Sequence, residues 1–231
     1  MNYAILAAGK GSRLVEDGIL LPKPLVPVCG ETLLSRLLSI FVRMKAQNIC
    51  VIINKEMKEV EQYLKNWQIS NPDVRLQICI QSTESSMHSF ASLSELLPEG
   101  RFVLTTVDTV FQEKEFCDYI EAFSQCEFDG LFAVTRYVDD EKPLWISTNS
   151  EQRIIEFSDS YGTFVSGGIY GLDTRTAFPV LRECLASGKS RMRNYQRALL
   201  SAGLHIKAFE FSKIFDIDHK NDIEKASHFL R

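Results

Sequence analysis

Short apolar runs recur along the first part of the chain, and the first of them, at residues 3–7, shows no polar alternation. They stand at residues 3–7, 49–54, 74–80, 102–107 and 130–134. Runs of this length and composition are typical of strands that are covered on both faces. The pattern therefore predicts buried strands at these positions.

Stretches with helical spacing of apolar residues separate these runs. Thr32 can cap a helix that carries an apolar stripe of Leu33, Leu34, Leu37, Leu38 and Phe41. Further helical stretches lie around Val60 and Leu64 and run through Phe116, Ile120 and Phe123. Alternating strands and helices imply a mostly parallel sheet with helices on both faces. A ligand is then expected past the carboxyl ends of the strands.

The second half of the chain has strands at shorter spacing. Runs at 144–149, 153–157 and 164–172 suggest a small antiparallel extension laid over the sheet. Two helical stretches at about 174–187 and 190–203, a strand at 205–211 and a helix from about Lys220 follow. We expect one α/β, Rossmann-like domain over residues 1–231.

Composition narrows the classes of partner. The chain has 231 residues, a net charge of −4 and charges spread along its length, so it offers no basic field for nucleic acid. No apolar stretch approaches the roughly 18 residues of a membrane span, and the N-terminus lacks a secretory pattern, so we expect a cytoplasmic protein with no membrane partner. The six cysteines show no zinc-ligand spacing and are expected to be reduced core thiols.

The stretch LAAGKGSRL indicates an anion site directly after the first strand. Backbone N–H groups at Gly9 and Gly11 can approach a triphosphate without interference from a Cβ atom, and Arg13 and Lys23 add positive charge. The spacing fits neither a Walker A loop nor a dinucleotide fingerprint. Prolines at 22, 24 and 27 are expected to hold the backbone extended around Lys23.

LAAGKGSRL followed by PKPLVPVCGETLL resembles the signature of the sugar-1-phosphate nucleotidyltransferases, which include NDP-sugar pyrophosphorylases and MobA-like NTP transferases. The resemblance implies a glycosyltransferase-A-type fold and one nucleotidyltransferase domain. It implies that Arg13 and Lys23 act on the phosphates, and that the NTP is bound by Leu6, Ala7, Ala8, Gly9, Lys10, Gly11, Ser12, Arg13 and Lys23. FVSGGIYGLD resembles the family's acceptor strand, which assigns Ser166, Gly167 and Gly168 to the acceptor.

Three aspartates are candidate ligands of Mg²⁺. The resemblance places a metal-binding aspartate at Asp108, in VLTTVDTVF, and a second ligand in FDIDHKNDIEKA, at Asp216 or Asp218. Nucleotidyl transfer needs a divalent ion, and Mg²⁺ prefers one or two carboxylates together with phosphate oxygens. We take Asp216 as the main second ligand. An aspartate after a strand is also a common turn former or helix cap.

The segments that would contact the nucleobase and the acceptor depart from the hexose pattern. Gln81 stands where members carry a base-contacting glutamine, but Ser86 replaces the usual glycine. The segment is closer to members that cytidylylate choline phosphate, and His88 can contact the base or have a structural partner. Asp159 replaces a lysine that holds the sugar phosphate, so we expect it to select the acceptor. Arg191 and Arg193 qualify as phosphate contacts by charge alone.

These observations favour a Mg²⁺-dependent nucleotidyltransferase that joins an NTP to a sugar 1-phosphate or a similar phosphorylated alcohol. One alternative keeps the fold and cytidylylates phosphocholine or another amino-alcohol phosphate. A more distant one takes Asp216 and Asp218 as the DxD motif of a glycosyltransferase, and another is a non-catalytic ligand-sensing relative. The nucleobase, the acceptor and the oligomeric state stay open.

Overall fold

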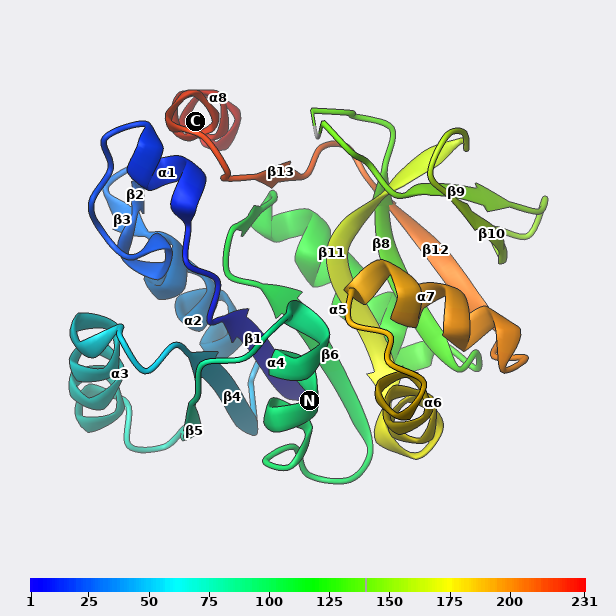
Figure 1. Cartoon of the computed structure of the whole chain (residues 1–231), viewed down its shortest axis with the longest axis horizontal. Helices are drawn as coiled ribbons and strands as arrows, with labels where there is room; N and C mark the ends of the chain where they lie inside the picture. Colours follow the sequence, from blue (N-terminus) through cyan, green and yellow to red (C-terminus); the bar gives the residue numbers. More distant parts are fainter. Residues whose placement is uncertain (140) are drawn as a thin grey trace.

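A computed structural model describes residues 1–139 and 141–231, and a mixed sheet forms its centre (Figure 1). The sheet has nine strands in the described part of the chain. They are β1 (Asn2–Ala7), β4 (Asn48–Ile53), β5 (Arg75–Ile80), β6 (Arg101–Thr106), β8 (Gly130–Thr135), β9 (Trp145–Thr148), β10 (Ile154–Ser158), β11 (Phe164–Asp173) and β12 (Ile206–Phe211).

The strand order confirms the Rossmann-like expectation. Strands β5, β4, β1 and β6 lie side by side and parallel, with Ala4 of β1 level with Cys50 and Leu104. Strand β12 pairs in parallel with β8, and β9 and β10 form an antiparallel hairpin. Strand β11 runs antiparallel between β6 and β8. Because it is hydrogen-bonded to both neighbours, β11 belongs to the main sheet and does not lie over it. Most of its residues are buried.

Helices cover both faces of the sheet, as the sequence predicts. Tyr3 and Ile5 point to one face and Ala4 and Leu6 to the other, because side chains alternate along a strand. The first face packs against α2 (Leu33–Arg43), α3 (Lys58–Ser70) and α5 (Glu113–Gln125). The second packs against α4 (Ser86–Ser94), α6 (Thr174–Ala186) and α7 (Met192–Ser201). Thr32 caps α2 by accepting the N–H of Ser35 at 3.1 Å.

Short elements beside the sheet carry the predicted loop. Helix α1 (Ser12–Glu16) follows β1. Two small antiparallel sheets pair β2 (Pro27–Val28) with β3 (Glu31–Thr32) and β7 (Thr109–Val110) with β13 (Phe215–Asp216). Helix α8 (Lys220–Leu230) ends the chain near α1 (Figure 1).

The backbone around Lys23 differs from the extended form that we expected. Residues Lys23–Leu25 form a 3-10 helix, in which Leu25 N–H donates to Pro22 O at 2.8 Å and Val26 N–H to Lys23 O at 3.1 Å. Neither bond needs an N–H from Pro22 or Pro24, so the prolines are compatible with the turn. Pro22 and Val26 on either side keep extended ψ values of 134° and 127°.

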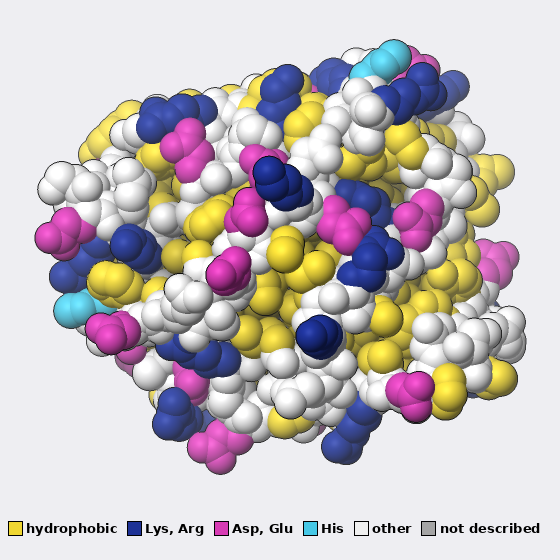
Figure 2. Space-filling view, turned by 180° about the vertical axis from the view of Figure 1, so that it is seen from behind, with side chains coloured by type: hydrophobic (Ala, Val, Ile, Leu, Met, Phe, Trp, Pro, Cys, Tyr) yellow, Lys and Arg dark blue, Asp and Glu magenta, His cyan; other side chains and the backbone are white. Residues whose placement is uncertain are grey.

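The surface mixes both signs of charge. On the face that Figure 2 shows, Lys and Arg side chains are interspersed with Asp and Glu. Within residues 1–139 and 141–231, no helix is both long and apolar enough to cross a membrane. The cysteines are free thiols, but Cys29 and Cys117 are exposed, so the expectation of core thiols is wrong for these two.

Candidate active site

A cavity of about 540 Å³ lies past the carboxyl ends of β1, β4 and β6, where a parallel sheet is expected to bind its ligand. We call it the loop cavity. Its lining includes many residues that the sequence assigns to the NTP: Leu6, Ala8, Gly9, Lys10, Gly11, Ser12, Arg13, Lys23 and Ser86, together with Asp108 and Asp218.

Gly11 is required where the loop enters α1. Its φ of +62° lies in the left-handed region, which favours glycine. A Cβ atom on Gly11 would also lie 3.3 Å from Lys23 Cβ. The loop backbone can therefore pass close to Lys23 only with glycine at this position.

Lys23 forms the centre of a network of ion pairs in this cavity. Its Nζ lies 2.5 Å from Asp108 Oδ2 and 2.8 Å from Asp218 Oδ1. Arg13 donates to the other oxygen of Asp218 at 2.6 Å. The Lys23 side chain is 9% exposed and that of Asp108 22%, so water screens this pair weakly. The network joins the loop, the end of β6 and the segment before α8.

The charges of this network stabilise one another. Burial alone would lower the pKa of Lys23, but the Asp108 and Asp218 carboxylates outweigh it and raise that pKa above its ordinary value. Burial would raise the pKa of Asp108, yet the Lys23 ammonium and the Thr106 hydroxyl hold it below its usual range. We infer that Lys23 and Asp108 are both charged at neutral pH.

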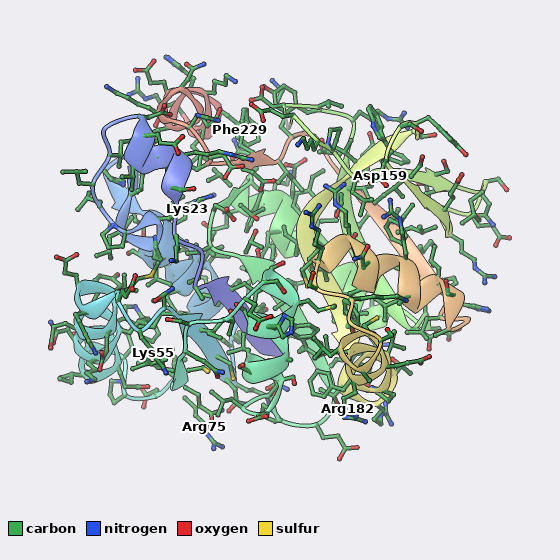
Figure 3. The ribbon with its side chains drawn as sticks, in the orientation of Figure 1. Lys23, Lys55, Arg75, Asp159, Arg182 and Phe229 are labelled. Atoms are coloured by element: carbon green, nitrogen blue, oxygen red, sulfur yellow. The ribbon has the colours of Figure 1, made fainter. Side chains whose placement is uncertain are left out.

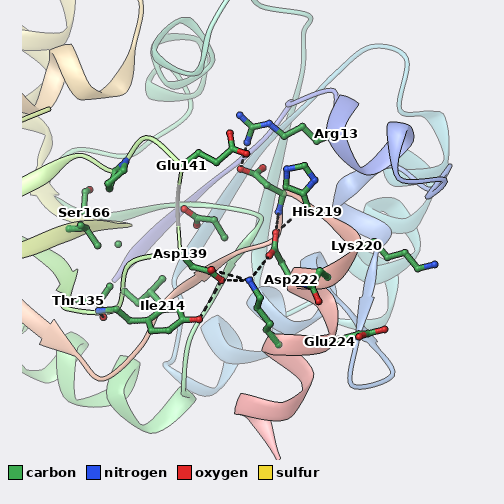
Figure 4. Close-up of a pocket in the computed structure, with 18 of the residues that line it drawn as sticks. Arg13, Thr135, Asp139, Glu141, Ser166, Ile214, His219, Lys220, Asp222 and Glu224 are labelled. Carbon is green, nitrogen blue, oxygen red and sulfur yellow. Dashed lines mark hydrogen bonds and ion pairs between the residues drawn. The ribbon is translucent and has the colours of Figure 1, made fainter. Parts of the chain in front are cut away.

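Figure 4 shows the lining of a second cavity, which has a volume of about 650 Å³. We call it the C-terminal cavity, because nine of its lining residues lie between Ile214 and Lys225. Arg13 and Asp218 line both cavities, so the two spaces meet at this ion pair. Of the residues that the sequence assigns to the acceptor or the metal, Ser166, Gly167 and Asp216 also line the C-terminal cavity.

Contacts between distant parts of the chain place Asp218. His219 caps α8 and its Nδ1 lies 3.0 Å from Asp17 Oδ2, which also accepts the N–H of Lys220 at 2.9 Å. Asp222 in turn accepts the N–H of His219 at 2.7 Å. The start of α8 is thereby attached to the end of α1, and Asp218 is directed towards Lys23.

Ser166 is held by buried polar side chains. Its Oγ donates to Gln196 Oε1 at 3.1 Å, and Gln196 Nε2 donates to Tyr170 Oη at 3.2 Å. Gln196 is 3% exposed and Tyr170 6%, so these groups would be costly to leave unpaired. Ser166 therefore has a fixed orientation at the wall of the C-terminal cavity.

Gly168 has a structural role beside the site. Its φ is +71°, and a Cβ atom would lie 2.9 Å from Thr109 Oγ1, which is hydrogen-bonded to Thr106 Oγ1 at 2.6 Å.

We expect Gly168→Ala to lower the free energy of unfolding by about 2 kcal/mol, and Tm by about 4–8 °C. Thermal unfolding by circular dichroism measures this. Gly9→Ala is the control, because its Cβ meets no atom within 4 Å. Equal Tm values would contradict the expectation.

Several assigned residues line neither cavity. Ala7 is buried in the core, and Gln81 and Gly168 lie outside both linings. His88 Nδ1 lies 2.9 Å from Oγ of Ser85, the residue that caps α4. Of the two alternatives for His88, a contact with the base or a structural partner, the structure thus shows a partner. The assignments of Gln81 and His88 to the base stay predictions.

Asp159 lies on the side of the molecule formed by β9, β10 and β11, apart from Lys23 (Figure 3). Its carboxylate is paired with Arg193 and Arg197, each at 2.8 Å, and its side chain is 61% exposed. The two arginines compensate its charge, and it lines neither cavity. Its selection of the acceptor stays a prediction without support from this geometry.

Polar residues of the loop cavity that the sequence analysis missed follow strand ends or lie on α4. Asn54 directly follows β4, is 5% exposed, and accepts the Ser82 hydroxyl at 2.9 Å. Thr83 and Ser89 share a hydrogen bond of 2.5 Å in the same lining. Asn54 ends the apolar run at 49–54, and a polar residue at the carboxyl end of a buried parallel strand is the signal that could have found it.

The donor set fits a metal that is bound together with a phosphorylated ligand. In the described residues, no group of three or more His, Cys, Asp and Glu side chains could hold a metal ion. However, Asp108 and Asp218 already share one cation, the Lys23 ammonium. Mg²⁺ commonly uses one or two carboxylates and completes its octahedron with phosphate oxygens and water. Two carboxylates facing the loop cavity meet that requirement.

Comparisons with known proteins show similarity along the whole chain. The family model of the MobA-like NTP transferase domain matches residues 3–199. The bifunctional protein GlmU of Methanococcus maripaludis (strain C5) is 23% identical over 239 residues, which cover 100% of this chain and 54% of that protein. GlmU of Prochlorococcus marinus (strain MIT 9313) is 42% identical over 68 residues, or 29% of this chain and 15% of that protein. The chain spans about half the length of the relatives that it matches end to end.

Solved structures confirm the fold. The inositol-1-phosphate CTP transferase of T. maritima superposes with a TM-score of 0.81 and 16% identity, covering 100% of this chain and 97% of that one. A Bacillus anthracis protein assigned as a glucose-1-phosphate thymidylyltransferase gives a TM-score of 0.86 and 21% identity, covering 100% and 95%. The family match ends at residue 199 and therefore does not include Asp216 or Asp218.

Proposed function

Because the chain belongs to the MobA-like NTP transferase domain family, we propose that residues 1–231 form one nucleotidyltransferase domain that joins an NTP to a phosphorylated small-molecule acceptor. A sugar 1-phosphate is the leading acceptor, pyrophosphate is the second product, and Mg²⁺ is the cofactor. The acceptor classes named for the similar proteins, glucose 1-phosphate and inositol 1-phosphate, support this choice.

The meeting of the two cavities at Arg13 and Asp218 carries the proposal. An NTP in the loop cavity would have its phosphates beside Lys23 and Arg13. An acceptor in the C-terminal cavity would bring its phosphate to the same ion pair. Two bound reactants held in this way meet at one point, and such positioning is a large part of catalysis.

In the proposed reaction, a phosphate oxygen of the acceptor attacks the α-phosphorus of the NTP in line. A bond forms between that oxygen and the α-phosphorus. The bond between the α-phosphorus and the oxygen that bridges it to the β-phosphorus breaks, and pyrophosphate leaves with the electron pair of the broken bond. Lys23 and Arg13 would stabilise the negative charge on the α-phosphate and the leaving group. Mg²⁺, held by Asp108 with Asp216 or Asp218, would neutralise phosphate charge.

The charge of the C-terminal cavity favours a second candidate acceptor, an amino-alcohol phosphate such as phosphocholine. Seven acidic residues line this cavity against three basic ones. The acidic residues are Asp17, Asp139, Glu141, Asp216, Asp218, Asp222 and Glu224, and the basic ones are Arg13, Lys220 and Lys225. A cationic head group would be stabilised there, whereas a neutral sugar would gain only hydrogen bonds.

A pyrophosphate-release assay tests the proposal. The purified protein is incubated with Mg²⁺, each of the four NTPs, and a panel of glucose 1-phosphate, inositol 1-phosphate, N-acetylglucosamine 1-phosphate and phosphocholine. We expect release that depends on both substrates, from a narrow set of pairs. Turnover with phosphocholine alone would favour the second candidate. Absence of release with every pair would contradict nucleotidyl transfer to these acceptor classes.

A further inference from the structure

The Lys23 ammonium lies between the two carboxylates that we assign to the divalent cation. Its Nζ is 2.5 Å from Asp108 Oδ2 and 2.8 Å from Asp218 Oδ1. Mg²⁺ binds carboxylate oxygens at about 2.0–2.1 Å. A divalent ion on the same two oxygens would lie against the ammonium with little water to screen the repulsion. Lys23 and a divalent cation therefore exclude one another at this pair.

The protein alone offers an incomplete metal site. Within the part of the chain that the structure describes, no third acidic, His or Cys side chain joins Asp108 and Asp218 in a group able to hold a metal. Asp218 also pairs with Arg13 at 2.6 Å, which adds a second competing cation. The missing oxygen ligands have to come from another molecule, and the loop cavity beside Lys23 is shaped by the loop that we assign to the triphosphate.

We propose that Lys23 keeps the Asp108 and Asp218 carboxylates closed to divalent cations until a triphosphate enters the loop cavity. The triphosphate draws the ammonium away, because its charge is greater than that of either carboxylate, and the metal then binds with the nucleotide. Lys23 thus acts first as the counter-ion of the empty site and then as a phosphate contact. This inference rests on the proposed function for the identity of the triphosphate, and its first test needs no nucleotide.

Binding of Mn²⁺ without nucleotide provides that test. Free Mn²⁺ is counted by electron paramagnetic resonance as it is titrated into the wild-type protein and three variants. We expect Lys23→Met, which keeps the length of the side chain without the charge, to bind Mn²⁺ at least about tenfold more tightly than the wild type. Lys23→Arg keeps a cation and should bind as weakly as the wild type.

Lys10→Met is the matched control for net charge. Lys10 lies in the same loop and lining, is exposed, and forms no ion pair within the described residues. If the gain in Mn²⁺ affinity reflects direct displacement, Lys10→Met should change the affinity by less than about threefold. Equal gains for Lys10→Met and Lys23→Met would show a general charge effect and overturn the proposal, as would unchanged affinity in Lys23→Met.

A second measurement uses the wild-type protein, in case Lys23→Met does not fold. Water-proton relaxation reports Mn²⁺ that is bound to the protein, with inorganic tripolyphosphate as the probe. We expect relaxation enhancement only when tripolyphosphate is present. Tight Mn²⁺ binding without it would overturn the proposal. Neither experiment depends on turnover, so a negative pyrophosphate-release assay would reject the proposed function and leave this result standing.

Discussion

Replacing Lys23 with alanine should lower the turnover of nucleotidyl transfer by at least about a hundredfold. The ammonium is nearly buried, is held 2.5 Å from Asp108, and lines the cavity that we assign to the triphosphate. Loss of one preorganised group that stabilises transition-state charge costs about 100- to 1,000-fold in comparable sites. Steady-state kinetics with the active substrate pair measures the loss as kcat.

The control for this prediction is Lys114→Ala, which removes an exposed charge of α5 outside both cavities and should lower kcat much less. Lys23→Ala also leaves Asp108 and Asp218 without their shared cation, and an uncompensated buried charge destabilises a fold. Unfolding curves must therefore show that the variant is folded at the assay temperature. Near-normal kcat in folded Lys23→Ala would remove this residue from the phosphate site.

The fold was largely predictable because several strands of its sheet, such as β1 and β8, are fully buried. The runs that begin at Tyr3 and Ile49 have no polar alternation, and both lie in the parallel part of the sheet. Helix α4 was not predicted. Its nine residues include four serines, which are poor helix formers, and it is stabilised by the packing of Met87 and Phe90 in the core.

The loop side of the site was also predictable, because a glycine-rich loop and its cations are close in sequence. The C-terminal side was not. Asp216 and Asp218 are two residues apart, and spacing alone does not distinguish them. Contacts with distant residues give the two side chains different positions. Asp216 lies in β13, which pairs with β7, while Asp218 precedes His219, which contacts Asp17, 202 residues away. Long-range contacts of this kind leave no local pattern.

The second large effect concerns the proposed metal ligands. We expect Asp108→Asn and Asp218→Asn each to lower kcat by about a hundredfold or more and to raise the Mg²⁺ concentration required for half-maximal activity. A neutral amide is a poor ligand for a hard cation, and these two carboxylates share one cation, the Lys23 ammonium, at the loop cavity. Activity measured against Mg²⁺ concentration for each variant gives both quantities.

Asp216→Asn decides between the geometry and the sequence. The sequence favours Asp216 as the main second ligand, whereas its side chain lines the C-terminal cavity and Asp218 lines both cavities. If Asp218 holds the metal, Asp216→Asn should chiefly raise the KM of the acceptor and leave the Mg²⁺ requirement nearly unchanged.

The exposed Asp118 of α5 supplies the control variant, Asp118→Asn, which should resemble the wild type. If the Mg²⁺ requirement rises more in Asp216→Asn than in Asp218→Asn, Asp216 and not Asp218 is the second metal ligand. The metal ligands would then be Asp108 and Asp216. Lys23 would block only Asp108 of these two, because its ammonium is ion-paired with Asp108 and Asp218.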